Sequence, residues 1–212
     1  MDEMLNWRSV YDFWFPPGLE NANQETHWRM LQWWMGGGAN AELARFAPVL
    51  EAARSGRLDQ WTGTPRGRLS LIVVLDQFSR GLHAGTADAY ASDTEALRIA
   101  GEGVKNGHYE ALAHPWERFF FLMPFAHVEG PDHRERMERI VKLSQEAVRE
   151  APAHLRPIFE FSLSQARGHR DVIARFGRFP HRNAVLGRTS TPEEVAYLEK
   201  GDYVYNRPLP AK

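Results

Sequence analysis

The chain has 212 residues, no cysteine, and 26 lysine and arginine residues against 27 aspartate and glutamate residues, for a formal net charge of −1. This length predicts a single domain over residues 1–212, the missing cysteines exclude disulfides, thiolate metal sites and a cysteine nucleophile, and the charge balance argues against a general nucleic-acid binder. The first nine residues lack the apolar run of a signal peptide, and the longest apolar stretches, residues 69–75 and 119–126, are too short to span a bilayer, so we expect a soluble, cytoplasmic protein with no membrane or nucleic-acid partner.

The first part of the chain is expected to be helical. Apolar residues recur at helical spacing, and the expected helices cover residues 6–15, 23–35, 39–55 and 64–79. The last of these has an apolar middle, which is typical of a helix packed on several sides. Its β-branched run Ile72-Val73-Val74 also allows a strand. We favour the helix because Thr64 and Pro65 form a helix-start signal.

The second part of the chain is also expected to be helical. A helix that starts near residue 86 or 92 runs to about 106, and Pro115 starts another that runs to about 128. An amphipathic helix over residues 132–150 precedes one that starts near 153 and ends at Gly177. The segment from Thr191 to Glu194 is a capping-box pattern that opens a short last helix. Short connections throughout predict an all-α bundle or array of helical hairpins.

Asp76 interrupts the most apolar helix of the chain. A buried carboxylate is costly unless it is paired. Arg80 lies four residues later, in the favourable order for an ion pair along a helix. Asp76 could instead accept backbone N–H groups from a neighbouring loop, or act as a general base or as the orienter of a catalytic arginine. These alternatives stay open at this point.

Two histidines lie on apolar helix faces. His127 shares a face with Phe120 and Met123, and His169 lies in line with Ile173. Each is either a buried, hydrogen-bonded core residue or a proton-transfer group, since imidazole titrates near neutral pH. A metal site built from these two, Glu129 and His181 lacks any supporting spacing, so we expect no metal and no cofactor.

The strongest sequence signal is an excess of positive charge near the C-terminus. Between Phe161 and Ser190 there are six arginines and two histidines against one acid, Asp171. Guanidinium groups on a constrained loop recognise carboxylate or phosphate. The structural alternative is that arginines beyond a helix C-terminus bond its free carbonyls while Asn183 supplies a left-handed turn. If the arginines serve a ligand, replacing Arg178 or Arg182 should leave stability unchanged or raise it.

At these residues the chain resembles a known family, the mainly bacterial domain of unknown function 924. The resemblance covers essentially the whole chain and implies an all-helical fold similar to tetratricopeptide arrays, with no established activity. Its motifs are Phe13-Trp14-Phe15, Leu75 to Arg80 with Gly85, Thr86 and Asp93, Met123-Pro124 with His127 and Glu129, and the block from His169 to Glu194. This chain departs from the family at Ala84, where an arginine is usual, and at the residues that flank Arg80.

The leading functional hypothesis is a pocket for a small anionic ligand, with His127, His181, Glu129 and Asp76 as the candidates for acid–base chemistry. The alternative is a tetratricopeptide-like module that offers a groove to a peptide, with the arginines serving structure. The residues expected to bind the anion are Arg80, Arg175, Arg178, His181, Arg182, Asn183 and Arg188.

Overall fold

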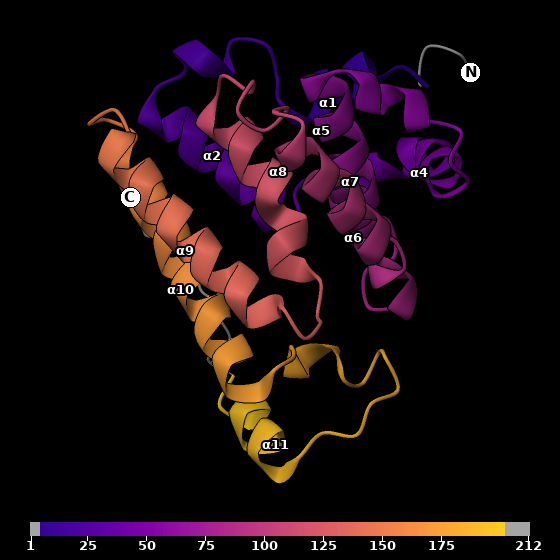
Figure 1. The fold of residues 1–212 in the computed structure, drawn as a ribbon, viewed down its shortest axis with the longest axis vertical. Coiled ribbons are helices and arrows are strands. Elements are labelled where there is room, and N and C mark those ends of the chain that lie inside the picture. Colours follow the sequence, from indigo (N-terminus) through magenta and orange to yellow (C-terminus); the bar gives the residue numbers. More distant parts are fainter. Residues whose placement is uncertain (1–4, 202–212) are drawn as a thin grey trace. The chain divides into compact units, whose positions relative to one another are not determined.

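A computed structural model describes residues 5–201, and every regular element in this range is helical (Figure 1). The all-α fold class is therefore confirmed. Within the same range, no helix is both long enough and apolar enough to cross a membrane. The α-helices are α1 (Trp7–Trp14), α2 (Gln24–Met35), α3 (Asn40–Leu43), α4 (Ala47–Arg54), α5 (Pro65–Val73), α6 (Ser79–Leu82), α7 (Asp93–Lys105), α8 (Pro115–His127), α9 (His133–Glu150), α10 (Arg156–Phe176) and α11 (Pro192–Glu199).

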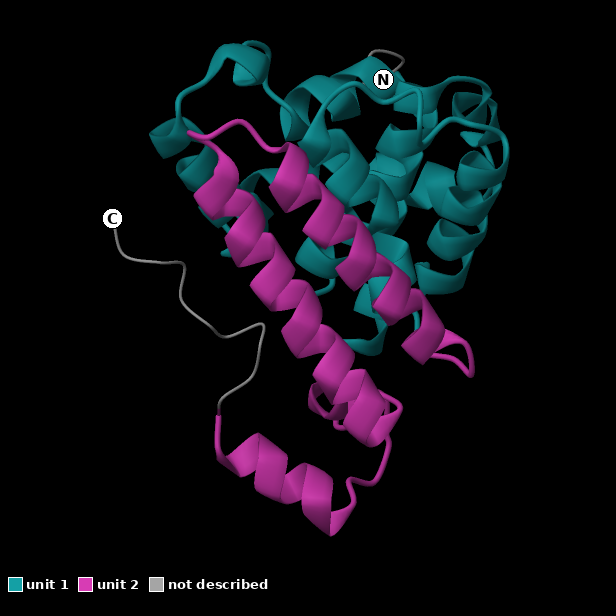
Figure 2. Cartoon of the chain, turned by 60° about the vertical axis from the view of Figure 1, so that its left-hand side comes forward, with its two compact units in different colours: residues 1–128 teal, residues 129–212 magenta. Residues whose placement is uncertain are grey.

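The chain divides into two compact units, Met1–Val128 and Glu129–Lys212, coloured teal and magenta in Figure 2. Unit 1, the first of these, contains all seven tryptophans of the chain. Its core includes a cluster of aromatic rings in which Trp14 contacts Phe78 and Phe120 edge-on, both with ring centroids 5.5 Å apart. Unit 1 therefore has a dense apolar core in which any buried charge requires compensation.

The helix expected over residues 64–79 is present, with an irregularity near its end. Thr64 caps it by accepting a hydrogen bond from the backbone N–H of Gly67 at 3.1 Å. After α5 the backbone widens into a π-helical turn, Val74–Phe78, and then continues as α6. The strand alternative is thus excluded. Such π turns are frequent at functional sites, and this one contains Asp76.

The helix expected over residues 39–55 is interrupted. In its place are α3, a 3₁₀ turn (Ala44–Phe46) and α4. Pro48 explains the interruption, since proline has no backbone N–H and its ring clashes with the carbonyl four residues earlier, here that of Ala44. In the first turn of a helix a proline removes no helical hydrogen bond, and this is where α4 places Pro48.

Three elements of unit 1 bring polar groups together. The π turn packs against α7, and α7 packs against α8. Asp93 is the first residue of α7, and His127 is the last residue of α8. The polar cluster of unit 1 is thus formed by the start of α7, the end of α8 and the middle of the π turn.

The described part of unit 2, up to residue 201, contains the hairpin of α9 and α10, the loop 177–191 and α11 (Figure 1). The helix α10 ends at Gly177, as the sequence predicted, and Gly177 adopts the left-handed conformation with φ 69°. A 3₁₀ turn, Pro180–Arg182, follows within the loop. The expected capping box is also present, because Thr191 and Glu194 each accept a hydrogen bond from the other's backbone N–H.

Candidate functional site

Asp76 is the centre of a polar cluster in unit 1. Its residue is 0% exposed, and its carboxylate contacts three side chains. Nη1 of Arg80 lies 3.1 Å from Oδ1, and Nε2 of Gln77 lies 2.5 Å from Oδ2. Nδ1 of His127 lies 2.8 Å from Oδ1 and 3.0 Å from Oδ2. The predicted pairing of Asp76 with Arg80 is therefore present, and His127 is a further partner.

The contact with Asp76 determines which imidazole nitrogen of His127 can do chemistry. An ionised carboxylate only accepts hydrogen bonds, so Nδ1 of His127 must carry the hydrogen that points at Asp76. In the neutral ring Nε2 is then the basic nitrogen. The His127 side chain is 13% exposed, so the sequence-based expectation that it points inward is confirmed.

Arg80 connects Asp76 to a second carboxylate. Its guanidinium forms a bidentate ion pair with Asp93, with Nη1 2.8 Å from Oδ1 and Nη2 2.9 Å from Oδ2. It also donates to the backbone carbonyl of Asp76 at 2.8 Å. The order of contacts is thus Asp93, Arg80, Asp76 and His127.

The two carboxylates of this cluster are held in different electrostatic conditions. Burial alone would raise the pKa of Asp76, but the charge of Arg80 and the hydrogen bond from His127 outweigh it and hold that pKa well below its usual range. Burial raises the pKa of Asp93, and the attraction of Arg80 offsets this only in part. Asp76 is therefore the firmly ionised member, and Asp93 is the carboxylate that accepts a proton more readily.

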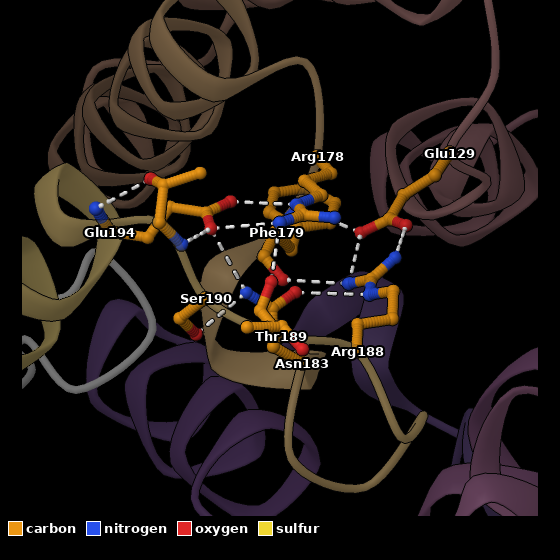
Figure 3. Close-up of polar contacts among 9 residues, drawn as sticks. Glu129, Arg178, Phe179, Asn183, Arg188, Thr189, Ser190 and Glu194 are labelled. Atoms are coloured by element: carbon orange, nitrogen blue, oxygen red, sulfur yellow. Dashed lines mark hydrogen bonds and ion pairs between the residues drawn. The ribbon is translucent and has the colours of Figure 1, made fainter.

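Part of the arginine block of unit 2 is paired with a buried glutamate (Figure 3). Nε and Nη2 of Arg178 donate to the carboxylate of Glu194 at 2.6 and 2.8 Å. Asn183 also donates to Glu194, at 3.2 Å. The hydrogen bond from Arg178 is the largest influence on Glu194 and lowers the pKa of that carboxyl from 4.5 to about 2. Burial of Glu194 opposes this effect without reversing it.

A second glutamate completes the network of Figure 3. Glu129 accepts a hydrogen bond from the backbone N–H of Phe179 at 2.6 Å and is paired with both terminal nitrogens of Arg188. Nε of Arg188 donates to Oδ1 of Asn183 at 3.0 Å. Burial would raise the pKa of Glu129, but the hydrogen bonds from Arg188 and Phe179 lower it below its ordinary value. Asn183 thus links the two glutamate sites.

Asn183 does not supply a left-handed turn. Its φ of −58° and ψ of −47° are right-handed, and the left-handed positions of the loop are Gly177 and Gly187. Glycine has no Cβ and adopts positive φ at no steric cost. The amide of Asn183 instead serves as a connector, donating to Glu194 and accepting from Arg188.

The remaining candidates of the block surround a buried ring or lie at the surface. The guanidinium carbon of Arg182 lies 4.6 Å from the ring centroid of Phe179, and the ring of His181 lies 5.5 Å from it. His169, noted in the sequence, contacts the same ring at 5.7 Å. Arg175 pairs with Glu193 at 2.7 Å, with both side chains at least half exposed. Within residues 5–201, no group of three or more histidine or acidic side chains is arranged to hold a metal ion.

The structure therefore places seven of the ten predicted site residues in two sets, and it places Arg175 beside Glu193 and both His181 and Arg182 beside the ring of Phe179. Asp76, Arg80 and His127 form one cluster in unit 1, and Glu129, Arg178, Asn183 and Arg188 share one network in unit 2. The positive charge near the C-terminus is compensated within unit 2, since at least four of the six arginines between Phe161 and Ser190 have carboxylate partners: Arg170, Arg175, Arg178 and Arg188.

Two residues of these clusters had little sequence signal. Glu194 was noted as the last residue of a capping box and as the end of a family motif, and its pairing with Arg178 spans 16 positions of the chain. Asp93 was noted only through the family resemblance. Its position directly after Ser92, at a helix start, was the available hint, because acidic residues are favoured in the first turn of a helix.

Comparison with known proteins found one family and one similar solved structure. A structure of a protein of unknown function, ATU0120 from Agrobacterium tumefaciens, is similar with 33% sequence identity and a TM-score of 0.70, over 92% of this chain and 97% of that one. No curated protein matches the sequence. The model of a bacterial family of unknown function, DUF924, matches residues 10–202. This chain belongs to the DUF924 family.

Proposed function

We propose that the chain binds a small anionic ligand, a phosphate or a carboxylate, at His127 and that His127 transfers a proton to or from it. The observation that carries this proposal is the contact of both Asp76 carboxylate oxygens with Nδ1 of His127, at 2.8 and 3.0 Å. A carboxylate behind an imidazole fixes its tautomer and orientation and stabilises the imidazolium, which is one arrangement that supports general acid–base catalysis.

In this proposal, Nε2 of His127 can donate a proton to the ligand or accept one from it. As an acid, the imidazolium of His127 donates the Nε2 proton to an oxygen of the ligand, and Nδ1 keeps its hydrogen bond to Asp76. As a base, neutral Nε2 accepts a proton from the ligand, and Asp76 stabilises the positive charge that forms. Asp76 stays ionised in both directions because its pKa is held well below the usual range.

The cost of the cluster supports a functional role. Replacing a buried ion pair by apolar residues is often neutral or stabilising, so stability alone is a weak reason to keep one. Here Asp76 lies at 0% exposure on a π turn, and π turns concentrate at functional sites. We place the ligand at His127 because Asp76 fixes the imidazole that would exchange a proton with it. By contrast, Arg175, Arg178 and Arg188 form ion pairs with carboxylates, and neither the network of Figure 3 nor the pair of Arg175 with Glu193 includes such a proton-transfer group.

The alternative of a tetratricopeptide-like module that binds a peptide stays a prediction. Among residues 5–201, the exposed large hydrophobic side chains are Met35 and Val195, at 41% and 42% exposure, and they belong to different units. An apolar peptide groove would require several such side chains side by side. The Asp76–His127 contact therefore gives the proton-transfer proposal the stronger support.

Replacing His127 by glutamine should abolish the stabilisation of the protein by inorganic phosphate. Binding to the folded state adds about 1.4 kcal/mol of stability for each tenfold increase of ligand above its dissociation constant. For a chain of this size that corresponds to a rise of roughly 3–6 °C in melting temperature per decade. The measurement is the melting temperature against phosphate concentration, with sodium chloride keeping the ionic strength constant.

The matched control is His154→Gln, the same change at an exposed histidine of unit 2. We expect wild type and this control to respond to phosphate alike. Citrate, run in the same way, tests the carboxylate class. If neither anion stabilises the wild type, or if His127→Gln responds as strongly as the control, the proposed function is wrong.

A further inference from the structure

We infer that Asp93 is a positioning residue of this site, which sets the charge state of His127 through Arg80. The inference rests on the proposed function of His127. The guanidinium of Arg80 connects the two residues, because it contacts the carboxylates of both Asp93 and Asp76, and Asp76 in turn contacts the imidazole of His127.

The geometry makes Arg80 a rigid connector. Nη2 of its guanidinium donates a hydrogen bond to Oδ2 of Asp93 at 2.9 Å, and Nη1 lies 2.8 Å from Oδ1 in an ion-pair contact, so Asp93 restricts the orientation of the planar group at both terminal nitrogens. Nη1 also reaches Oδ1 and the backbone carbonyl of Asp76, at 3.1 and 2.8 Å. A change in the position of the Asp93 carboxylate would therefore shift the Arg80 guanidinium, which is the positive charge that faces Asp76.

A second set of contacts holds Asp93 in place. Nε of Arg54 donates to the hydroxyl of Ser92 at 3.0 Å, directly before the first residue of α7. Nη2 of the same guanidinium donates to Ser79 Oγ at 3.0 Å and to the backbone carbonyl of Asp88 at 2.9 Å. Arg54 thus connects the start of α7 to α6, the helix that carries Arg80.

The charges of the cluster explain how Asp93 affects proton binding by His127. The groups that face Arg80 are Asp76, Asp93 and the ring of Tyr90, whose centroid lies 5.5 Å from the guanidinium carbon. With His127 neutral, two carboxylates and one guanidinium sum to −1, and one added proton makes the cluster neutral. Removing the charge of Asp93 makes the sum zero before that proton binds, so the electrostatic attraction for a proton on His127 falls.

The test is a nuclear magnetic resonance titration of the His127 imidazole in the full chain without ligand, with the signal assigned by its loss in His127→Gln. We expect Asp93→Asn to lower the titration midpoint of His127 by about 1 pH unit, the direction dictated by losing a nearby negative charge. Asp88→Asn makes the same chemical change at an exposed aspartate five residues earlier and should leave the midpoint unchanged. Asp93→Glu keeps the charge and should restore most of the wild-type value.

A merely structural Asp93 would give a different result. In that case Asp93→Asn lowers the melting temperature while the His127 midpoint equals that of wild type, and the inference is overturned. If Asp93→Asn does not fold, the wild-type protein supplies the second measurement. The ¹³C signal of the Asp93 carboxyl should then change at the same pH as the His127 imidazole, and a carboxyl signal that shows no step at that pH overturns the inference.

These titrations contain no phosphate, so they separate the two proposals. A lowered midpoint in Asp93→Asn, together with no response of the wild type to phosphate or citrate, overturns the proposed function and leaves the coupling of Asp93 to His127 supported. An unchanged midpoint, together with anion binding that depends on His127, overturns the inference about Asp93 alone.

Discussion

Replacing Arg80 by methionine should lower the free energy of unfolding by about 3–5 kcal/mol, the usual cost of removing one partner of a buried ion pair. The change leaves Asp76, at 0% exposure, without its guanidinium partner and removes both ion-pair contacts to Asp93. Methionine has a comparable length, so lost packing adds little. For a chain of this size the melting temperature should fall by at least about 6 °C.

The control for Arg80→Met is Arg57→Met, the same change at an exposed arginine of unit 1. Its guanidinium donates only to the nearby hydroxyl of Ser55 among the described contacts, so we expect a change within about 0.5 kcal/mol. Urea unfolding of both variants and the wild type provides the comparison. Equal stability of the two variants would show that Arg80 does not compensate the buried carboxylates.

Replacing Glu194 by glutamine should remove stability in a manner that depends on pH. The carboxylate accepts hydrogen bonds from Arg178, Asn183 and the backbone of Thr191, and losing its charge should cost about 2 kcal/mol at pH 7. Its folded-state pKa of about 2 lies below the unfolded value near 4.5. A carboxyl with a lowered pKa stabilises the fold above the unfolded value and loses this contribution as pH falls through the folded value.

The difference in melting temperature between wild type and Glu194→Gln should therefore be constant from about pH 7 to 5 and shrink between about pH 4.5 and 2. Glu193→Gln is the matched control. The carboxylate of Glu193 pairs with Arg175 at the surface, and exposed ion pairs contribute little to stability. A difference for Glu194→Gln that does not change with pH would mean that the amide, rather than the lost charge, causes the effect.

The pairing of Arg178 also reverses one expectation from the sequence. A ligand-binding arginine would be replaced without loss of stability, whereas Arg178 forms two hydrogen bonds to the buried Glu194. We now expect Arg178→Met to destabilise unit 2. The density of arginines in the sequence correctly indicated a charged network. The carboxylates that pair with these arginines can be distant in sequence, as Glu129 is, 59 residues before Arg188.

Local physics explains what could be predicted from the sequence. Four predicted features each depend on residues within four positions of one another, and all four are present. They are the caps at Thr64 and Thr191, the helix end at Gly177 and the ion pair of Asp76 with Arg80. The interruption at Pro48 was the one local signal that the apolar spacing of residues 39–55 obscured.

Tertiary packing explains what could not be predicted. The contact between Asp76 and His127 joins residues 51 positions apart, and helical spacing gives only the face of each helix. The π turn that carries Asp76 has no signature in its sequence. Arg80 had an obvious partner one turn away, so nothing indicated that Asp93, 13 positions later, would be its second.

The central claim is that Asp76 makes Nε2 of His127 the nitrogen that exchanges protons with a bound anion. A long-range ¹H–¹⁵N spectrum of the histidine side chains, recorded with and without inorganic phosphate, measures this directly. We predict that neutral His127 carries its hydrogen on Nδ1 and that phosphate shifts the Nε2 resonance. A spectrum in which the hydrogen is on Nε2, and in which phosphate leaves both nitrogen resonances unchanged, would contradict the account.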